Sequence, residues 1–172
     1  GRLLAAPLVI WLILGERYGT AFWVFVAAGV SDGLDGYIAK RFDMRTRLGA
    51  LLDPIADKSL LASVFVALGF EGRLPDWLVI LVVFRDVMII GGYMLIQVTA
   101  AARQFDPLYI SKINTAAQIA LVAFVLARLG VGFGDGPVTT VLVSAVAVTT
   151  VLSGGSYFVR WARILAGAEP VL

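Results

Sequence analysis

The stretch "VSDGLDGYIAKRFDMRTRLGALLDPIADK", residues 30–58, decides the fold, because it places four aspartates where one apolar run ends and the next begins. Asp32 and Asp35 lie toward the end of the run 20–42, and Asp53 and Asp57 lie near the start of the run 48–69. Residues three or four apart share one face of an α-helix, so each pair projects from one side of its helix. The short connection makes the two helices antiparallel neighbours. The sequence therefore predicts four carboxylates gathered in one cavity.

The rest of the chain is unusually apolar. Of its 172 residues 60% are hydrophobic and 15% are charged, which is typical of a membrane protein rather than a soluble domain. Six apolar runs are candidates to cross a bilayer core of about 30 Å as helices. We expect one all-α integral membrane domain, residues 1–172, with six transmembrane helices. The runs cover residues 3–14, 20–42, 48–69, 75–102, 108–129 and 137–160.

The first run looks short, and the chain begins with Gly1 rather than Met. We therefore expect the natural N-terminus to lie upstream of the given sequence.

Basic side chains are divided unevenly between the two ends of these runs. Lys58 and Arg85 lie within runs, three arginines (Arg17, Arg73 and Arg128) lie at one end, and nine basic residues lie at the end of the termini. The positive-inside rule then places the termini and the aspartates on the cytoplasmic side. The brevity of the chain favours a bacterial inner membrane over a mitochondrial inner membrane. The nine are Arg2, Lys40, Arg41, Arg45, Arg47, Arg103, Lys112, Arg160 and Arg163.

Missing residue types narrow the chemistry. The chain contains no His and no Cys, which excludes histidine-bound zinc, a phosphohistidine intermediate and thiolate catalysis. Basic and acidic residues are nearly equal in number, and the resulting net charge of +2 is too small to indicate nucleic-acid binding. Clustered carboxylates in a low dielectric need cations, and ligand sets made only of oxygen select Mg²⁺, Mn²⁺ or Ca²⁺. Two such ions would hold a pyrophosphate during a phosphoryl-type displacement.

A cation transporter or channel is the alternative from another class. An ion pathway would continue the acidic residues across the bilayer. The runs 108–129 and 137–160 contain no acidic residue, and the four aspartates gather at one end. A phosphodiester-transfer site is therefore the favoured interpretation.

The segment "DGLDGYIAKRFDMRTRLGALLDPIAD" resembles the signature of the CDP-alcohol phosphatidyltransferase family, D-x2-D-G-x2-A-R-x8-G-x3-D-x3-D. All specified positions match except Lys40, where the family usually has Arg. The resemblance implies a homodimer of six-helix subunits with a cavity open to the cytosol. It also implies that the four aspartates surround two Mg²⁺ or Mn²⁺ ions, with Asp57 as the base that deprotonates the acceptor. Gly36, Ala39, Lys40 and Gly49 would contact the CDP group.

Two further stretches bear on the acceptor alcohol. "FRDVMII" (84–90) and "ISKINTAAQ" (110–118) resemble cardiolipin-forming members, which have R-D-V and S-K-x-N-T patterns. Members that use glycerol 3-phosphate more often have R-E and G-K-x-K-T. The resemblance implies attack by phosphatidylglycerol on the phosphatidyl phosphorus of CDP-diacylglycerol, with release of CMP. Glycerol 3-phosphate, giving phosphatidylglycerophosphate, is the alternative acceptor, and both direct transfer and a covalent intermediate remain open.

Arg85 and Lys112 are the candidate ligands for an acceptor phosphate. Each is a cation at or inside the end of an apolar run, where an unpaired charge is expensive. The alternative for Arg85 is an ion pair with Asp86 or another carboxylate. The alternative for Lys112 is a side chain that extends to the membrane interface.

Overall fold

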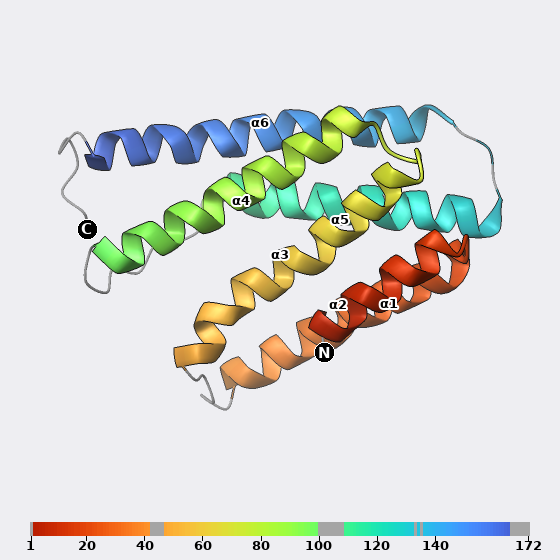
Figure 1. The fold of residues 1–172 in the computed structure, drawn as a ribbon, viewed down its shortest axis with the longest axis horizontal. Helices are drawn as coiled ribbons and strands as arrows, with labels where there is room; N and C mark the ends of the chain where they lie inside the picture. Colours follow the sequence, from red (N-terminus) through yellow and green to blue (C-terminus); the bar gives the residue numbers. More distant parts are fainter. Residues whose placement is uncertain (1, 42–46, 100–108, 133, 135, 166–172) are drawn as a thin grey trace.

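The computed structural model describes residues 2–41, 47–99, 109–132, 134 and 136–165. Side chains are described there except those of residues 2–4, 32, 35–41, 47–57, 93–99 and 163–165. Over the described residues the chain forms six α-helices and no strand, and each helix coincides with one of the predicted runs (Figure 1). The helices are α1 (Arg2–Leu14), α2 (Tyr18–Arg41), α3 (Arg47–Phe70), α4 (Asp76–Thr99), α5 (Tyr109–Val131) and α6 (Pro137–Leu165).

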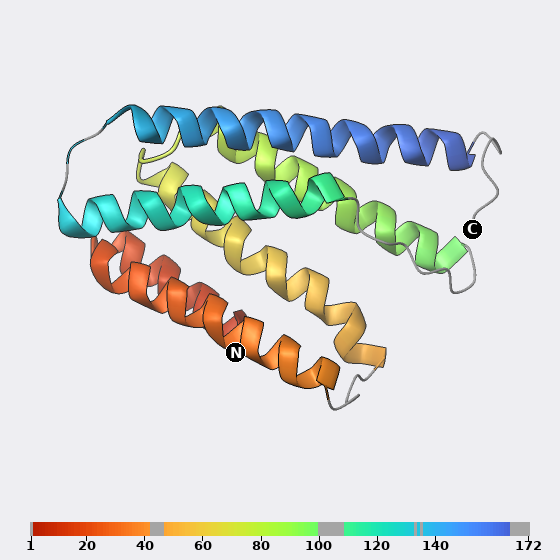
Figure 2. The same cartoon turned by 180° about the vertical axis from the view of Figure 1, so that it is seen from behind.

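Successive helices run in opposite directions (Figures 1 and 2). The turns that join α1 to α2, α3 to α4 and α5 to α6 lie at one end of the molecule. The C-terminal ends of α2, α4 and α6 and the N-terminal ends of α3 and α5 lie at the other. This up-and-down arrangement confirms the alternation on which the charge count depends. The cytoplasmic side assigned to the second end remains a prediction.

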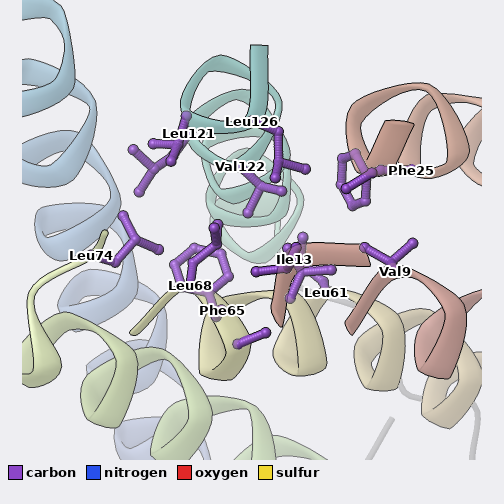
Figure 3. Close-up of a cluster of buried hydrophobic side chains, with 14 of the residues drawn as sticks. Val9, Ile13, Phe25, Leu61, Phe65, Leu68, Leu74, Leu121, Val122 and Leu126 are labelled. Carbon is purple, nitrogen blue, oxygen red and sulfur yellow. The ribbon is translucent and has the colours of Figure 1, made fainter. Parts of the chain in front are cut away.

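Helix α3 lies at the centre and packs against α1, α4 and α5. Figure 3 shows Phe65 and Leu68 of α3 between Ile13 of α1 and Leu121 of α5. Among the described side chains, the buried members of this cluster are mostly branched aliphatic or aromatic. They hold α3 against α1 and α5.

Helices α1 and α3 each end in a turn with the same hydrogen-bond pattern. The N–H of Arg17 donates to the carbonyl of Leu12 at 2.8 Å, and the N–H of Arg73 donates to that of Leu68 at 2.8 Å. Each turn contains one residue with positive φ, Glu16 at 55° and Gly72 at 66°. These are Schellman-type caps, which satisfy the last carbonyls of a helix and reverse the chain within a few residues.

Two glycines permit close contacts between helices. A Cβ on Gly130 would lie 2.6 Å from the Cα of Gly19, so the end of α5 meets the start of α2 backbone to backbone. A Cβ on Gly92 would lie 1.7 Å from the indole ring of Trp161, so this ring of α6 rests directly on α4. Small residues at helix contacts are a common feature of packing in membranes.

The prediction of six transmembrane helices is supported only in part. Within the described residues, two helices are long and apolar enough to cross a bilayer, Tyr109–Val131 and Pro137–Ala162. Shorter apolar segments cover Ala5–Leu14, Tyr18–Ser31 and Lys58–Phe70.

Candidate functional site

The four aspartates lie on the two helices predicted for them, toward the helix ends that the sequence indicated. Asp32 and Asp35 belong to the C-terminal part of α2, and Asp53 and Asp57 belong to the N-terminal part of α3. Both segments lie at the same end of the molecule, where α2 ends at Arg41 and α3 begins at Arg47 (Figure 1). The backbone thus brings together the two segments that carry the aspartate pairs. The side chains of all four lie outside the described residues.

The donor set fits a hard divalent cation, because it consists of carboxylates from two neighbouring helix ends. Among the described side chains, no three His, Cys, Asp or Glu residues lie close enough to hold a metal ion. The metal assignment remains a proposal.

The residues predicted to contact CDP also lie on these two helices. Gly36, Ala39 and Lys40 follow Asp35 in the last turns of α2, and Gly49 lies in the first turn of α3. Their side-chain surroundings lie outside the described residues, so their roles remain predictions.

A second polar site surrounds Arg85 in the middle of α4. The side chain is 2% exposed, although it carries a full charge. Its NH1 donates to Asp86 Oδ1 at 2.6 Å, and its NH2 donates to Ser111 Oγ of α5 at 2.6 Å and to Ser153 Oγ of α6. The ion pair with Asp86, which the sequence suggested as the alternative for Arg85, is confirmed. Three helices thus meet at one guanidinium.

Lys58 connects this site to the aspartate helix. Its Nζ donates to Asp86 Oδ1 at 2.8 Å, so one carboxylate oxygen of α4 serves both cations. Lys58 directly follows Asp57 on α3. The contact therefore places the Arg85 site beside the helix segment that carries Asp57, at the same level of the bundle.

A polar seam continues from Arg85 between α5 and α6. Asn114 lies one turn beyond Ser111 on α5, and its Oδ1 accepts hydrogen bonds from Thr149 at 2.8 Å and Thr150 at 2.9 Å. Gln118 lies one further turn along the same face, and both amides are 0% exposed. Within an apolar bundle, a buried polar row of this kind is expensive unless it is hydrogen-bonded.

Several polar atoms along this seam have no protein partner among the described residues. They are Arg85 Nε, Asp86 Oδ2, Asn114 Nδ2 and both amide atoms of Gln118. Native proteins leave few buried polar groups unpaired, and the exceptions require an explanation such as a ligand or a bound water. Arg85 Nε and Asn114 Nδ2 are donors, which suit an acceptor-rich ligand.

Lys112 is placed differently from Arg85. It is exposed on the first turns of α5, whereas its neighbour Ser111 faces Arg85. The two cations predicted as ligands of one phosphate therefore do not share one buried environment. This position also suits the alternative, a lysine that extends to the membrane interface.

The sequence did not identify most of the Arg85 site. Ser153, Thr149, Thr150 and Gln118 carry no local signal, because a single polar residue in an apolar run is common. Lys58 was noted only as a charge within a run. A usable signal was present in α5, where Ser111, Asn114 and Gln118 recur at spacings of three and four residues and mark one polar face.

The comparisons with known proteins agree with the fold and the motif. Residues 1–153 match the family model described as CDP-alcohol phosphatidyltransferase. The chain therefore belongs to the CDP-alcohol phosphatidyltransferase family, and this confirms the resemblance drawn from residues 32–57.

The relatives carry names of two kinds, cardiolipin synthases and glycerol-3-phosphate phosphatidyltransferases. The chain is 35% identical to human cardiolipin synthase (CMP-forming) over 91% of its length, and 34% identical to the rat protein over 91%. It is 32% identical over 95% of its length to a rice chloroplastic CDP-diacylglycerol–glycerol-3-phosphate 3-phosphatidyltransferase. The chain spans 58%, 57% and 55% of these relatives' own lengths, respectively.

Proposed function

We propose that the protein is a membrane-bound phosphatidyltransferase that makes cardiolipin from CDP-diacylglycerol and phosphatidylglycerol and releases CMP. The observation that carries this proposal is the position of the buried Arg85 site beside the aspartate helix, fixed by the Lys58–Asp86 ion pair of 2.8 Å. A donor site on α2 and α3 and an anion site on α4 to α6 would then face each other at the same level. The names of the human and rat relatives favour this product.

Residues of the donor site are proposed to divide the work as follows. Asp32, Asp35, Asp53 and Asp57 hold Mg²⁺ or Mn²⁺, and a bound pair of these ions would neutralise the pyrophosphate of the donor. Asp57 removes the proton of the acceptor hydroxyl, since a carboxylate is the available base in a chain without His. Gly36, Ala39, Lys40 and Gly49 bind the CDP group.

The acceptor phosphate is proposed to bind at Arg85. Two of the three guanidinium nitrogens are already held by Asp86, Ser111 and Ser153, which orient the side chain. Among the described residues, no partner accepts a hydrogen bond from Nε, which is therefore available as a donor. Lys112, exposed next to Ser111, is the second candidate and would contact the head group from the interface. We place the reaction at the cytoplasmic face of a bacterial inner membrane, in a homodimer.

Glycerol 3-phosphate is the second candidate acceptor. The rice relative is named for that substrate, and the protein from Mycobacterium tuberculosis, 33% identical over 86% of this chain, is named a probable phosphatidylglycerophosphate synthase. The acceptor is therefore the part of the proposal that most needs an experiment.

The test is release of CMP from CDP-diacylglycerol by the purified protein with Mg²⁺ or Mn²⁺. One reaction contains phosphatidylglycerol, one contains glycerol 3-phosphate and one contains neither. We expect release with phosphatidylglycerol and formation of cardiolipin. Release only with glycerol 3-phosphate would assign the second candidate, and activity that is unaffected by EDTA would contradict the metal site.

Arg85→Ala separates the acceptor site from the donor site. The substitution is expected to raise the KM for the acceptor more than the KM for CDP-diacylglycerol. Lys112→Ala is the comparison, because it removes a cation from the same helix bundle without disturbing the buried ion pair. Equal changes in both KM values for Arg85→Ala would contradict the acceptor role.

A further inference from the structure

A hollow opens on the surface beside the turn that joins α1 to α2, at the end of the bundle opposite to the aspartate segments (Figure 1). This Arg17 hollow has a volume of about 300 Å³, within the size range of small-ligand sites, and is lined by Trp11, Leu14, Gly15 and Arg17. The N–H groups of Gly15 and Arg17 donate to carbonyls in the last turn of α1 at 3.0 Å and 2.8 Å. The backbone that forms the hollow is therefore fixed before any ligand binds.

Arg17 brings a cation without a carboxylate partner to this hollow. Its guanidinium lies over the ring of Trp11, 5.7 Å from the ring centroid. In the described part of the chain the side chain forms no ion pair and no hydrogen bond, although Glu16 directly precedes it. Asp135, between α5 and α6, lies outside the described residues. On the described contacts, the guanidinium N–H groups are available to an acceptor-rich anion such as a phosphate.

The surroundings of the hollow resemble a membrane interface. Trp11 is 62% exposed and Leu14 is 48% exposed, so an apolar surface leads from the hollow along α1. Trp23, near the start of α2, and Trp77, at the start of α4, are also exposed at this end of the bundle. Exposed tryptophans are typical of the boundary between the hydrocarbon core and the head groups. A lipid chain beside Trp11 would thus have its phosphate level with Arg17.

We propose that the Arg17 hollow binds an anionic phospholipid, with the lipid phosphate on Arg17 and one acyl chain against Trp11 and Leu14. A zwitterionic lipid carries its own cation beside the phosphate, and that cation repels the guanidinium, so the anionic lipid is favoured. The site lies in the leaflet opposite to the aspartate segments. It requires the membrane location of the protein but not the proposed reaction, and the lipid held there is a structural ligand rather than a substrate.

The test is quenching of Trp11 fluorescence by brominated lipids. The full chain is used with its other tryptophans replaced, as Trp23→Phe, Trp77→Phe and Trp161→Phe. It is reconstituted in phosphatidylcholine vesicles that contain brominated phosphatidylserine or, in a parallel sample, brominated phosphatidylethanolamine. The two lipids differ by one negative charge, and neither is a substrate of the proposed reaction. We expect phosphatidylserine to bind beside Trp11 about fivefold more tightly, the effect of one arginine on an anionic lipid.

Arg17→Gln should reduce this preference to less than about twofold, because it removes the cation from the hollow. Arg73→Gln is the matched control. Arg73 is an exposed arginine at the same end, its guanidinium lies 5.5 Å from the centroid of the Tyr18 ring, and it does not line the hollow. The preference for phosphatidylserine should therefore persist in Arg73→Gln.

Equal affinity for the two lipids in the single-tryptophan protein would overturn the inference, as would an unchanged preference in Arg17→Gln. An equal loss of preference in Arg73→Gln would also overturn it, because the attraction would then belong to the whole end of the bundle. Should the tryptophan substitutions prevent folding, native mass spectrometry decides. Arg17→Gln should then retain fewer phosphatidylserine molecules than the wild type and Arg73→Gln, and equal numbers would contradict the site. None of these measurements uses CMP release, so the inference and the proposed function fail separately.

Discussion

The two polar regions of this molecule are built on opposite electrostatic principles. The aspartate segments of α2 and α3 carry four like charges within 26 residues of sequence. The Arg85 site combines two cations and one carboxylate from two helices, with hydroxyl partners from two more. As proposed above, the first region would bind cations that offset the repulsion among its carboxylates. The second region pairs its two cations with one carboxylate of its own.

This difference predicts different consequences of mutation. Removing a carboxylate from the first region relieves repulsion, so it should harm activity and spare stability. Removing the carboxylate from the second region leaves one buried cation, Arg85, and one partly buried cation, Lys58, uncompensated, so it should harm stability first.

Asp53→Asn should nearly abolish CMP release. A metal site supplies several kcal/mol of transition-state stabilisation, so we expect a loss on the order of a thousandfold in kcat/KM. The melting temperature in detergent without divalent ions should stay the same or rise. Asp76→Asn, at the exposed start of α4, is the control and should leave both quantities unchanged. Unchanged CMP release by Asp53→Asn would refute the site assignment.

Asp86→Asn should destabilise the fold by about 3 kcal/mol or more, because the carboxylate is 3% exposed and neutralises both Lys58 and Arg85. The measurement is the free energy of unfolding in detergent, compared with Asp53→Asn under the same conditions. Equal free energies of unfolding for the two variants would contradict the claim that the Asp86 carboxylate stabilises the fold and the Asp53 carboxylate does not.

Gly130→Ala should destabilise the bundle by about 1–3 kcal/mol, since the new methyl group would meet the backbone of Gly19 and neither helix has a flexible side chain to move there. Gly155→Ala on α6 is the matched control, because a Cβ at that position has no neighbour within 4 Å. A melting temperature of Gly130→Ala equal to that of the control would show that α2 and α5 do not meet closely.

Lys112→Ala should have the smallest effect. An exposed cation in a high-dielectric environment contributes little, so we expect the KM for phosphatidylglycerol to rise by less than about fivefold. A loss comparable to that of Arg85→Ala would place Lys112 in the same phosphate site. That result would extend the second region to the membrane surface.

Much of the fold was predictable from the sequence. Each of the six helices coincides with a predicted apolar run, and their alternating direction agrees with the division of basic residues between the two ends. The membrane crossing of all six is less secure, because two helices meet the length and composition criterion within the described residues.

One part of the candidate site was also predictable from the sequence, and the other was not. The aspartate motif was identifiable because its residues are close in sequence and their spacing matches the helical period. The contacts of the Arg85–Asp86 pair were not, because Ser111 and Ser153 are 26 and 68 positions from Arg85, and Lys58 is 28 positions from Asp86. No periodicity connects residues on different helices, so only packing brings them together.

The sequence by itself determined the helices, their order, and the placement of two aspartate pairs on neighbouring helix segments, because these depend on local spacing and on the balance of apolar and charged residues. The tertiary structure alone decided that Arg85 is buried and held by two other helices, and that one carboxylate joins it to Lys58, the residue that follows Asp57 on α3. The physical reason is that a net charge at a site is a sum over side chains brought together in space, and helix packing determines which side chains enter that sum.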